Sequence, residues 1–152
     1  MNRMDRRSFL KLAGTGSAAA VGVPMAGAFT SGRSGVVQFR ALLGLPEPPL
    51  PIYATHVVEG SVDLVSGRGL VTSRMLAGHP DGTSEVGLPG LSRVIRITAV
   101  DQSGAQLHLR GLIEDRSQLH PGEPPQVEMV LDRARGVVRA PFVGRQVELR
   151  LQ

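Results

Sequence analysis

Residues 127–151 read VEMVLDRARGVVRAPFVGRQVELRL, and their pattern is the clearest indication of the fold. Apolar and polar residues alternate at both ends of this stretch, with the apolar positions at Val127, Met129, Leu131, Val147, Leu149 and Leu151. A period of two is typical of strands that bury one face. Residues 132–136 form a turn, and Gly144-Arg145 fits a two-residue hairpin with Gly first. The stretch predicts three antiparallel strands.

The same pattern extends back along the chain. Strands are expected over residues 36–43, 58–64, 70–76, 91–100 and 106–113, with turns at 66–69 and 101–104. No window after the first 28 residues keeps an apolar stripe with helical spacing. We therefore predict one all-β domain over residues 36–152, an antiparallel meander of about eight strands. A small barrel is favoured over a sandwich because closure removes exposed edges.

Two connections stand out from the tight turns. Residues 45–51 contain four prolines, which donate no ladder hydrogen bond, so an extended connection is expected there; a PxxP ligand is the alternative. Residues 77–90 lack a strand pattern for 14 residues, and loops of that length are often functional.

The amino terminus carries a run of seven residues with two adjacent arginines, Asp5-Arg6-Arg7-Ser8-Phe9-Leu10-Lys11. It resembles the signature of a twin-arginine (Tat) export signal. The resemblance implies that the Tat translocase recognises this targeting signal through Arg6, Arg7, Phe9 and Leu10. It also implies a protein that works outside the cytoplasm: periplasmic, extracellular or at the cell surface.

The leader is assigned to residues 1–28. A mildly apolar segment follows the arginines, and Ala26 and Ala28 supply the small-x-small pattern of a cleavage site. The alternative is a retained anchor, the one way in which we expect this chain to contact a membrane. Gly14-Thr15-Gly16-Ser17-Ala18-Ala19 matches a dinucleotide fingerprint, but no strand precedes it and no acidic residue follows at the required distance. Residues 29–35 are expected to be a flexible arm.

Composition excludes several classes of function. Four of the 17 basic residues and one of the 13 acidic residues lie in the leader, so the remainder is nearly neutral. A nearly neutral domain is a poor candidate for binding nucleic acid. The chain has no Cys, which excludes disulfides, thiolate metal sites and a lipoprotein anchor through Cys. No cofactor is expected.

Candidate site residues are His79, Asp81 and Glu85, which share the 77–90 loop. Imidazole and carboxylate groups could bind a metal or transfer protons, whereas an ordinary rim loop is the alternative. His108 is expected on a strand surface, His120 in a loop and His56 at the start of a strand. The four histidines form no H-x-H or H-E-x-x-H motif, and no nucleophile motif is present.

Two functions from different classes remain open. The first is a non-enzymatic exported domain that binds a small apolar ligand or a protein partner. The second is a barrel-type cyclase or isomerase with acid/base groups at the barrel mouth. The strand pattern is similar in architecture to small secreted barrels, such as lipocalin-like and allene-oxide-cyclase-like or dirigent-like proteins. That similarity carries over no site residue.

Overall fold

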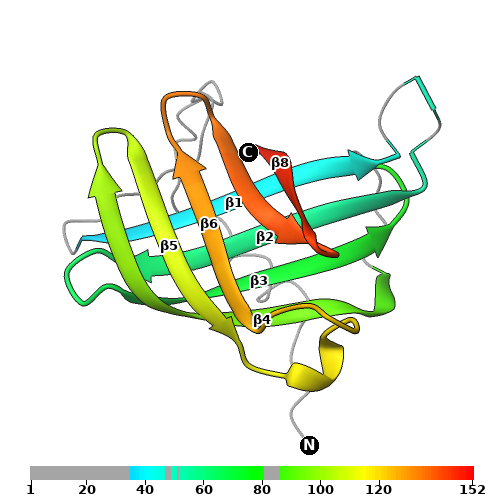
Figure 1. The fold of residues 1–152 in the computed structure, drawn as a ribbon. Helices are drawn as coiled ribbons and strands as arrows, with labels where there is room; N and C mark the ends of the chain where they lie inside the picture. Colours follow the sequence, from blue (N-terminus) through cyan, green and yellow to red (C-terminus); the bar gives the residue numbers. More distant parts are fainter. Residues whose placement is uncertain (1–34, 47–48, 51, 81–85) are drawn as a thin grey trace, which may run out of the picture.

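The computed structural model describes residues 35–46, 49–50, 52–80 and 86–152. Within these residues eight strands follow one another, with a short 3₁₀ helix between the fifth and the sixth (Figure 1). Their bounds are β1 (Val36–Leu45), β2 (Ala54–Asp63), β3 (Arg68–Ala77), β4 (Gly87–Ser103), β5 (Gln106–Ile113), η1 (Arg116–Gln118), β6 (Gln126–Asp132), β7 (Val137–Phe142) and β8 (Arg145–Leu151).

Each strand pairs antiparallel with the next, and β8 pairs with β1 to close a barrel. Ala41 lies opposite Leu151 at this closure, and the backbone N–H of Gln152 donates to the carbonyl of Arg40. Closure leaves no free sheet edge between β1 and β8, which is the physical reason for expecting it. The predicted all-β meander of about eight strands and the preferred small barrel are both confirmed.

The alternating apolar residues fill the barrel. On β5 the burial alternates strictly, with Leu107 and Leu109 buried between the exposed His108 and Arg110. The other strands contribute residues of the same kind, including Val37, Phe39, Val58, Val71, Ile95, Ile97, Met129, Leu131, Val138 and Leu149. Each fully buried side chain of this size contributes roughly 1.5–3 kcal/mol, so this core is the main source of stability in a chain without disulfides.

The barrel has two different ends. At the end that we call the hairpin end, tight turns over residues 64–67, 104–105 and 133–136 join neighbouring strands. At the opposite end, which we call the loop end, the chain passes from β1 to β2, from β3 to β4 and from β5 to β6, and the turn at 143–144 joins β7 to β8. The longer connections therefore gather at one end, where binding groups are most often found.

Two sequence predictions need correction. The final hairpin turns at Val143-Gly144, not at Gly144-Arg145, because Phe142 pairs with Arg145. The 77–90 loop is also shorter than predicted, since β4 begins at Gly87. Leu76 pairs with Gly87, and the backbone N–H of Ala77 donates to the carbonyl of Val86. Pairing with β3 therefore lengthens β4 at its start, although the residues there lack the alternation of apolar and polar side chains.

The β7–β8 turn contains a strained residue. Val143 has a φ of 46° and Gly144 a φ of 75°, the two positive values that a type I′ turn requires. A β-branched side chain in this region costs about 1–2 kcal/mol. We therefore expect Val143→Asn, which suits the turn, to stabilise the protein by about 1 kcal/mol in urea unfolding. Gly144→Ala is the matched control and should destabilise it; an unchanged midpoint for Val143→Asn would contradict the strain.

Candidate functional site

Three polar side chains face the barrel interior near the loop end. They are His56 on β2, Ser73 on β3 and Arg93 on β4, with exposed fractions of 0%, 8% and 8%. Each lies on the inward face of its strand, because it is an even number of residues away from apolar core residues on that strand. The register places Ser73 opposite Arg93, and His56 lies diagonally across from Ser73, opposite Met75. We call them the interior polar cluster.

His56 makes a hydrogen bond with Ser73. Its Nε2 lies 2.8 Å from the Ser73 Oγ, and the ring of Phe142 lies against it with centroids 4.8 Å apart. Burial, with a smaller contribution from the positive charge of Arg93, lowers the pKa of His56 to about 4. The imidazole is therefore neutral at neutral pH and can donate or accept a hydrogen bond.

Arg93 holds the β5–β6 connection against the barrel. Its guanidinium makes a bidentate ion pair with Glu123, and its Nη2 lies 2.8 Å from Oε2 of that residue. The same Nη2 donates to the carbonyl of Gln118 at 3.3 Å, and Glu123 Oε2 also accepts from the backbone N–H of His120 at 3.0 Å. Both side chains of the ion pair are 8% exposed, so its charges balance inside the protein.

A groove opens between β6 and β7 on the loop-end side. Pairing of these strands ends at Val130 and Arg139, and the strands then diverge (Figure 1). Pro141 has no N–H to donate, which favours the split. The resulting groove has a volume of about 290 Å³, and its lining includes Glu123, Pro124, Val127, Glu128, Pro141 and Gln146. We call it the seam groove; Glu123 links it to Arg93.

Two buried nitrogen atoms of the polar cluster have no hydrogen-bond partner within the described part of the chain. They are Nδ1 of His56 and Nε of Arg93. A buried polar group without a partner costs about 1–3 kcal/mol, and such groups in a native protein call for an explanation. A bound molecule that supplied the missing partners would recover that cost.

The predicted loop site is placed only in part. His79 is exposed and follows β3 at the loop end, whereas Asp81 and Glu85 lie outside the described residues. Within the described ranges, no three His, Asp or Glu side chains are close enough together to hold a metal ion. His108 and His120 are exposed, as expected for a strand surface and a loop.

Sequence reasoning missed His56 and Arg93 as site residues. The sequence did contain an indication. His56 is two residues from Val58 and Arg93 is two residues from Ile95, so each lies on the same face of its strand as a buried apolar residue. A polar residue in register with apolar core positions is an informative departure from the pattern. Glu123 gave no such signal, because it lies in a connection between strands.

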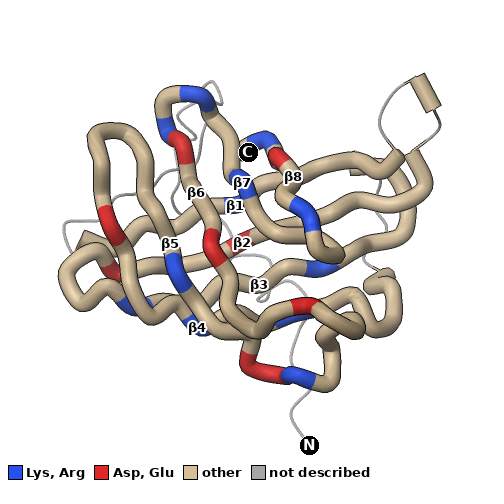
Figure 2. The backbone as a smooth tube through the Cα atoms, in the orientation of Figure 1, with Lys and Arg blue, Asp and Glu red and all other residues tan. Residues whose placement is uncertain are grey.

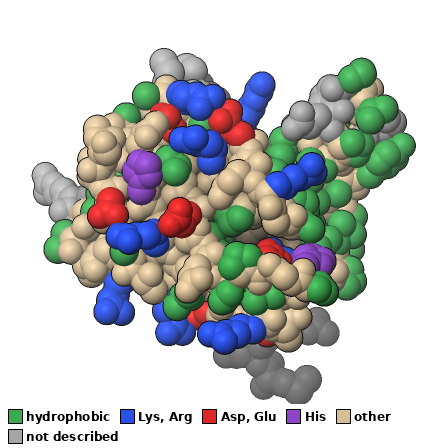
Figure 3. Space-filling view, in the orientation of Figure 1, with side chains coloured by type: hydrophobic (Ala, Val, Ile, Leu, Met, Phe, Trp, Pro, Cys, Tyr) green, Lys and Arg blue, Asp and Glu red, His purple; other side chains and the backbone are tan. Residues whose placement is uncertain are grey.

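Apolar side chains surround the loop end. Leu50, Tyr53, Val86 and Val143 are 46–69% exposed, and each belongs to a connection at this end. Hydrophobic side chains gather on the right-hand side of the molecule in Figure 3, where β1 ends and β2 begins. Elsewhere charges of both signs are mixed along the strands (Figure 2). Exposed apolar side chains also occur elsewhere, with Val65 86% exposed at the hairpin end and Leu70 and Leu112 exposed on strands, so the loop end has more of them but not all of them.

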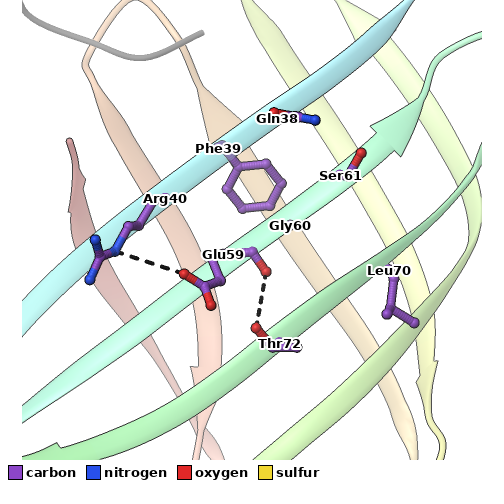
Figure 4. Close-up of a pocket in the computed structure, with 8 residues that line it drawn as sticks. All are labelled: Gln38, Phe39, Arg40, Glu59, Gly60, Ser61, Leu70 and Thr72. Carbon is purple, nitrogen blue, oxygen red and sulfur yellow. Dashed lines mark hydrogen bonds and ion pairs between the residues drawn. The ribbon is translucent and has the colours of Figure 1, made fainter. Parts of the chain in front are cut away.

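A second groove, of about 480 Å³, lies on the outer face of β1, β2 and β3, and its lining includes Gln38, Arg40, Ser61 and Thr72 (Figure 4). Gly60 also lines it, but a side chain there would point into the core against Phe39 and Val71. Arg40 and Glu59 form an ion pair at 3.8 Å beside it, and both side chains are largely solvated. This groove contains no buried charge or unpaired buried atom among the residues that line it, so the seam groove is the stronger candidate.

No protein-family model, curated protein or solved structure matches this chain. The function is therefore argued from the arrangement of its residues. In the described part of the chain, no helix is long and apolar enough to cross a membrane.

Proposed function

We propose that this chain is an exported, non-enzymatic barrel protein that binds a small, mainly apolar molecule at its loop end. The observation that carries the proposal is the seam groove, which reaches Glu123 and so borders the buried polar cluster. Ligand sites are typically concave and largely apolar, with a few polar groups that fix orientation. Val127, Pro124 and Pro141 supply apolar walls here, and the cluster supplies the polar groups.

The proposal predicts that filling the seam groove blocks binding. Gln146 lines the groove and is exposed, so Gln146→Trp should occupy the space without disturbing the core. We expect the dissociation constant of a neutral apolar dye, N-phenyl-1-naphthylamine, to rise at least tenfold, measured by fluorescence titration of the full chain. A loss of this size corresponds to about 1.4 kcal/mol.

The matched control for this substitution is Arg150→Trp. Arg150 is exposed on the same strand but does not line the groove. The control should bind the dye like the unmodified chain. Equal binding by Gln146→Trp and the unmodified chain would place the dye elsewhere, and no saturable binding by the unmodified chain would refute the proposed function.

Export by the Tat route is the second part of the proposal. It rests on the leader sequence alone, because residues 1–28 lie outside the described residues. Replacing Arg6 and Arg7 together with Lys should retain a reporter fusion in the cytoplasm, since the translocase reads the arginine pair. Cell fractionation would measure this. Undiminished export of the Lys variant, or export blocked only through the general secretory route, would contradict it.

An acid/base isomerase or cyclase remains the second candidate, favoured by one observation. The imidazole of His56, hydrogen bonded to Ser73, is unprotonated at neutral pH, which is the form that can accept a proton, although its low pKa makes it a weak base. Against it, the carboxylate of Glu123 is held by Arg93, so the His56–carboxylate pair that acid/base catalysis would favour is not formed among the described residues. A His56→Gln variant that keeps ligand binding but loses turnover of a bound ketone would support the enzyme.

A further inference from the structure

We infer that the ligand carries a neutral carbonyl oxygen on its apolar body, and that this oxygen accepts hydrogen bonds from His56 and Arg93. The inference rests on the proposed function, because it names the chemistry of the molecule that the same site binds. Three observations support it: the position of the seam groove beside the interior polar cluster, the balanced charge of that cluster, and its two nitrogen atoms without a hydrogen-bond partner.

The groove borders the cluster on two sides. Glu123 lines the groove and holds Arg93, whereas Pro141 lines it and precedes Phe142, whose ring lies against His56. Ser73 lies between the two ends of the cluster, since it bonds His56 and faces Arg93 in the strand register. A molecule in the groove beside Pro141 would therefore lie one residue from the Phe142 ring that packs against His56, and beside the carboxylate that holds Arg93.

The charge of the cluster is already balanced. Arg93 is paired with Glu123 through two hydrogen-bonding nitrogen atoms, and burial keeps His56 neutral. A ligand carboxylate would bring an unpaired negative charge into this buried site, and a ligand amine would bring an unpaired positive one. Burying an unpaired charge is far more costly than burying a neutral polar group. The balance therefore selects a neutral ligand.

The two unpaired atoms select an acceptor. Arg93 Nε carries a hydrogen and can only donate. We assign the tautomer in which the Ser73 hydroxyl donates to His56 Nε2, so that the neutral ring carries its hydrogen on Nδ1 and this atom also donates. Because His56 bonds Ser73 and Arg93 lies opposite Ser73 in the register, we assign both donors to one carbonyl oxygen, which accepts two hydrogen bonds. Met75, opposite His56 in the register, and Phe142 offer apolar contacts for the rest of the ligand.

Four naphthalene compounds that share one apolar body would test the inference. They are 2-acetylnaphthalene, 2-naphthoate, 2-(aminomethyl)naphthalene and 2-ethylnaphthalene. Titration of the full chain by calorimetry should show the ketone binding at least tenfold tighter than each of the other three. The double variant Arg93→Gln with Glu123→Gln removes the Nε donor without leaving a buried charge, and His56→Leu removes the other donor. Both should reduce this preference to below threefold, whereas His108→Leu, at an exposed position, should keep it.

The outcomes separate the inference from the proposed function. Equal affinity for all four compounds, or tightest binding of the carboxylate or the amine, would overturn the inference while apolar binding stood. Failure of all four and of the neutral dye to bind would overturn both. If His56→Leu does not fold, Ser73→Ala is the substitute, since the His56 ring then loses the hydroxyl that fixes its tautomer. A ketone preference that this folded variant retains in full would count against the proposed role of His56.

Discussion

Glu123→Gln is expected to lower the free energy of unfolding by about 3–5 kcal/mol, because removing one partner of a buried ion pair leaves the other charge uncompensated. Arg93 and Glu123 are each 8% exposed, and Glu123 also accepts the backbone N–H of His120. The substitution should therefore leave the Arg93 charge inside the barrel and loosen the connection between β5 and β6. Urea unfolding of the full chain at pH 7, followed by far-ultraviolet circular dichroism, measures this loss.

An exposed ion pair on the same barrel provides the control. Arg110 and Asp101 lie 2.9 Å apart, with side chains 57% and 67% exposed. Asp101→Asn should cost less than about 1 kcal/mol, because water screens the pair and solvates the remaining charge. Replacing both Arg93 and Glu123 with Met should recover much of the loss. A Glu123→Gln variant as stable as Asp101→Asn would show that the interior pair is solvated.

The fold followed from local information. Alternation of apolar and polar residues along 107–113 and 127–131 indicates which side chains are buried. The tight turns favour pairing between strands that are consecutive in the sequence. Closure of the barrel was a choice between two architectures, and it was settled by the physical cost of free edges. The hairpin pairings were predictable because each joins residues close in sequence, whereas the pairing of β1 with β8 joins distant residues and was expected only from the cost of free edges.

The site did not follow in the same way. His56 and Arg93 come from different strands, and only the register of β2, β3 and β4 brings them to the same serine. Glu123 comes from a connection 30 residues from Arg93. Nor could composition anticipate that the last hairpin would turn at Val143, since the pairing of Phe142 with Arg145 overrides the local preference for Gly at the first turn position.

Acidification is expected to destabilise the protein through His56 by about 3 kcal/mol between pH 6.5 and pH 4. Burial lowers the pKa of His56 from 6.5 to about 4 in the folded state. The unfolded chain therefore binds a proton at a higher pH than the folded chain does. The stability that the neutral ring contributes is complete above pH 6.5, is lost as the pH falls through this window, and changes no further below pH 4.

Urea unfolding at intervals from pH 7.5 to pH 4.5 would measure this slope. Titration of three carboxylates does not contribute to the slope in this pH range; they belong to Asp63, Asp115 and Asp132. Hydrogen bonds lower their pKa values, so the stability linked to them is lost in more acidic solution. His56→Leu should remove most of the slope, since the variant has no proton to bind at this position. His108→Leu, at an exposed site, should keep it, because that ring meets water in both states. A His56→Leu variant with the slope of the unmodified chain would locate the titrating group elsewhere, and a flat profile for the unmodified chain would mean that the His56 ring is hydrated.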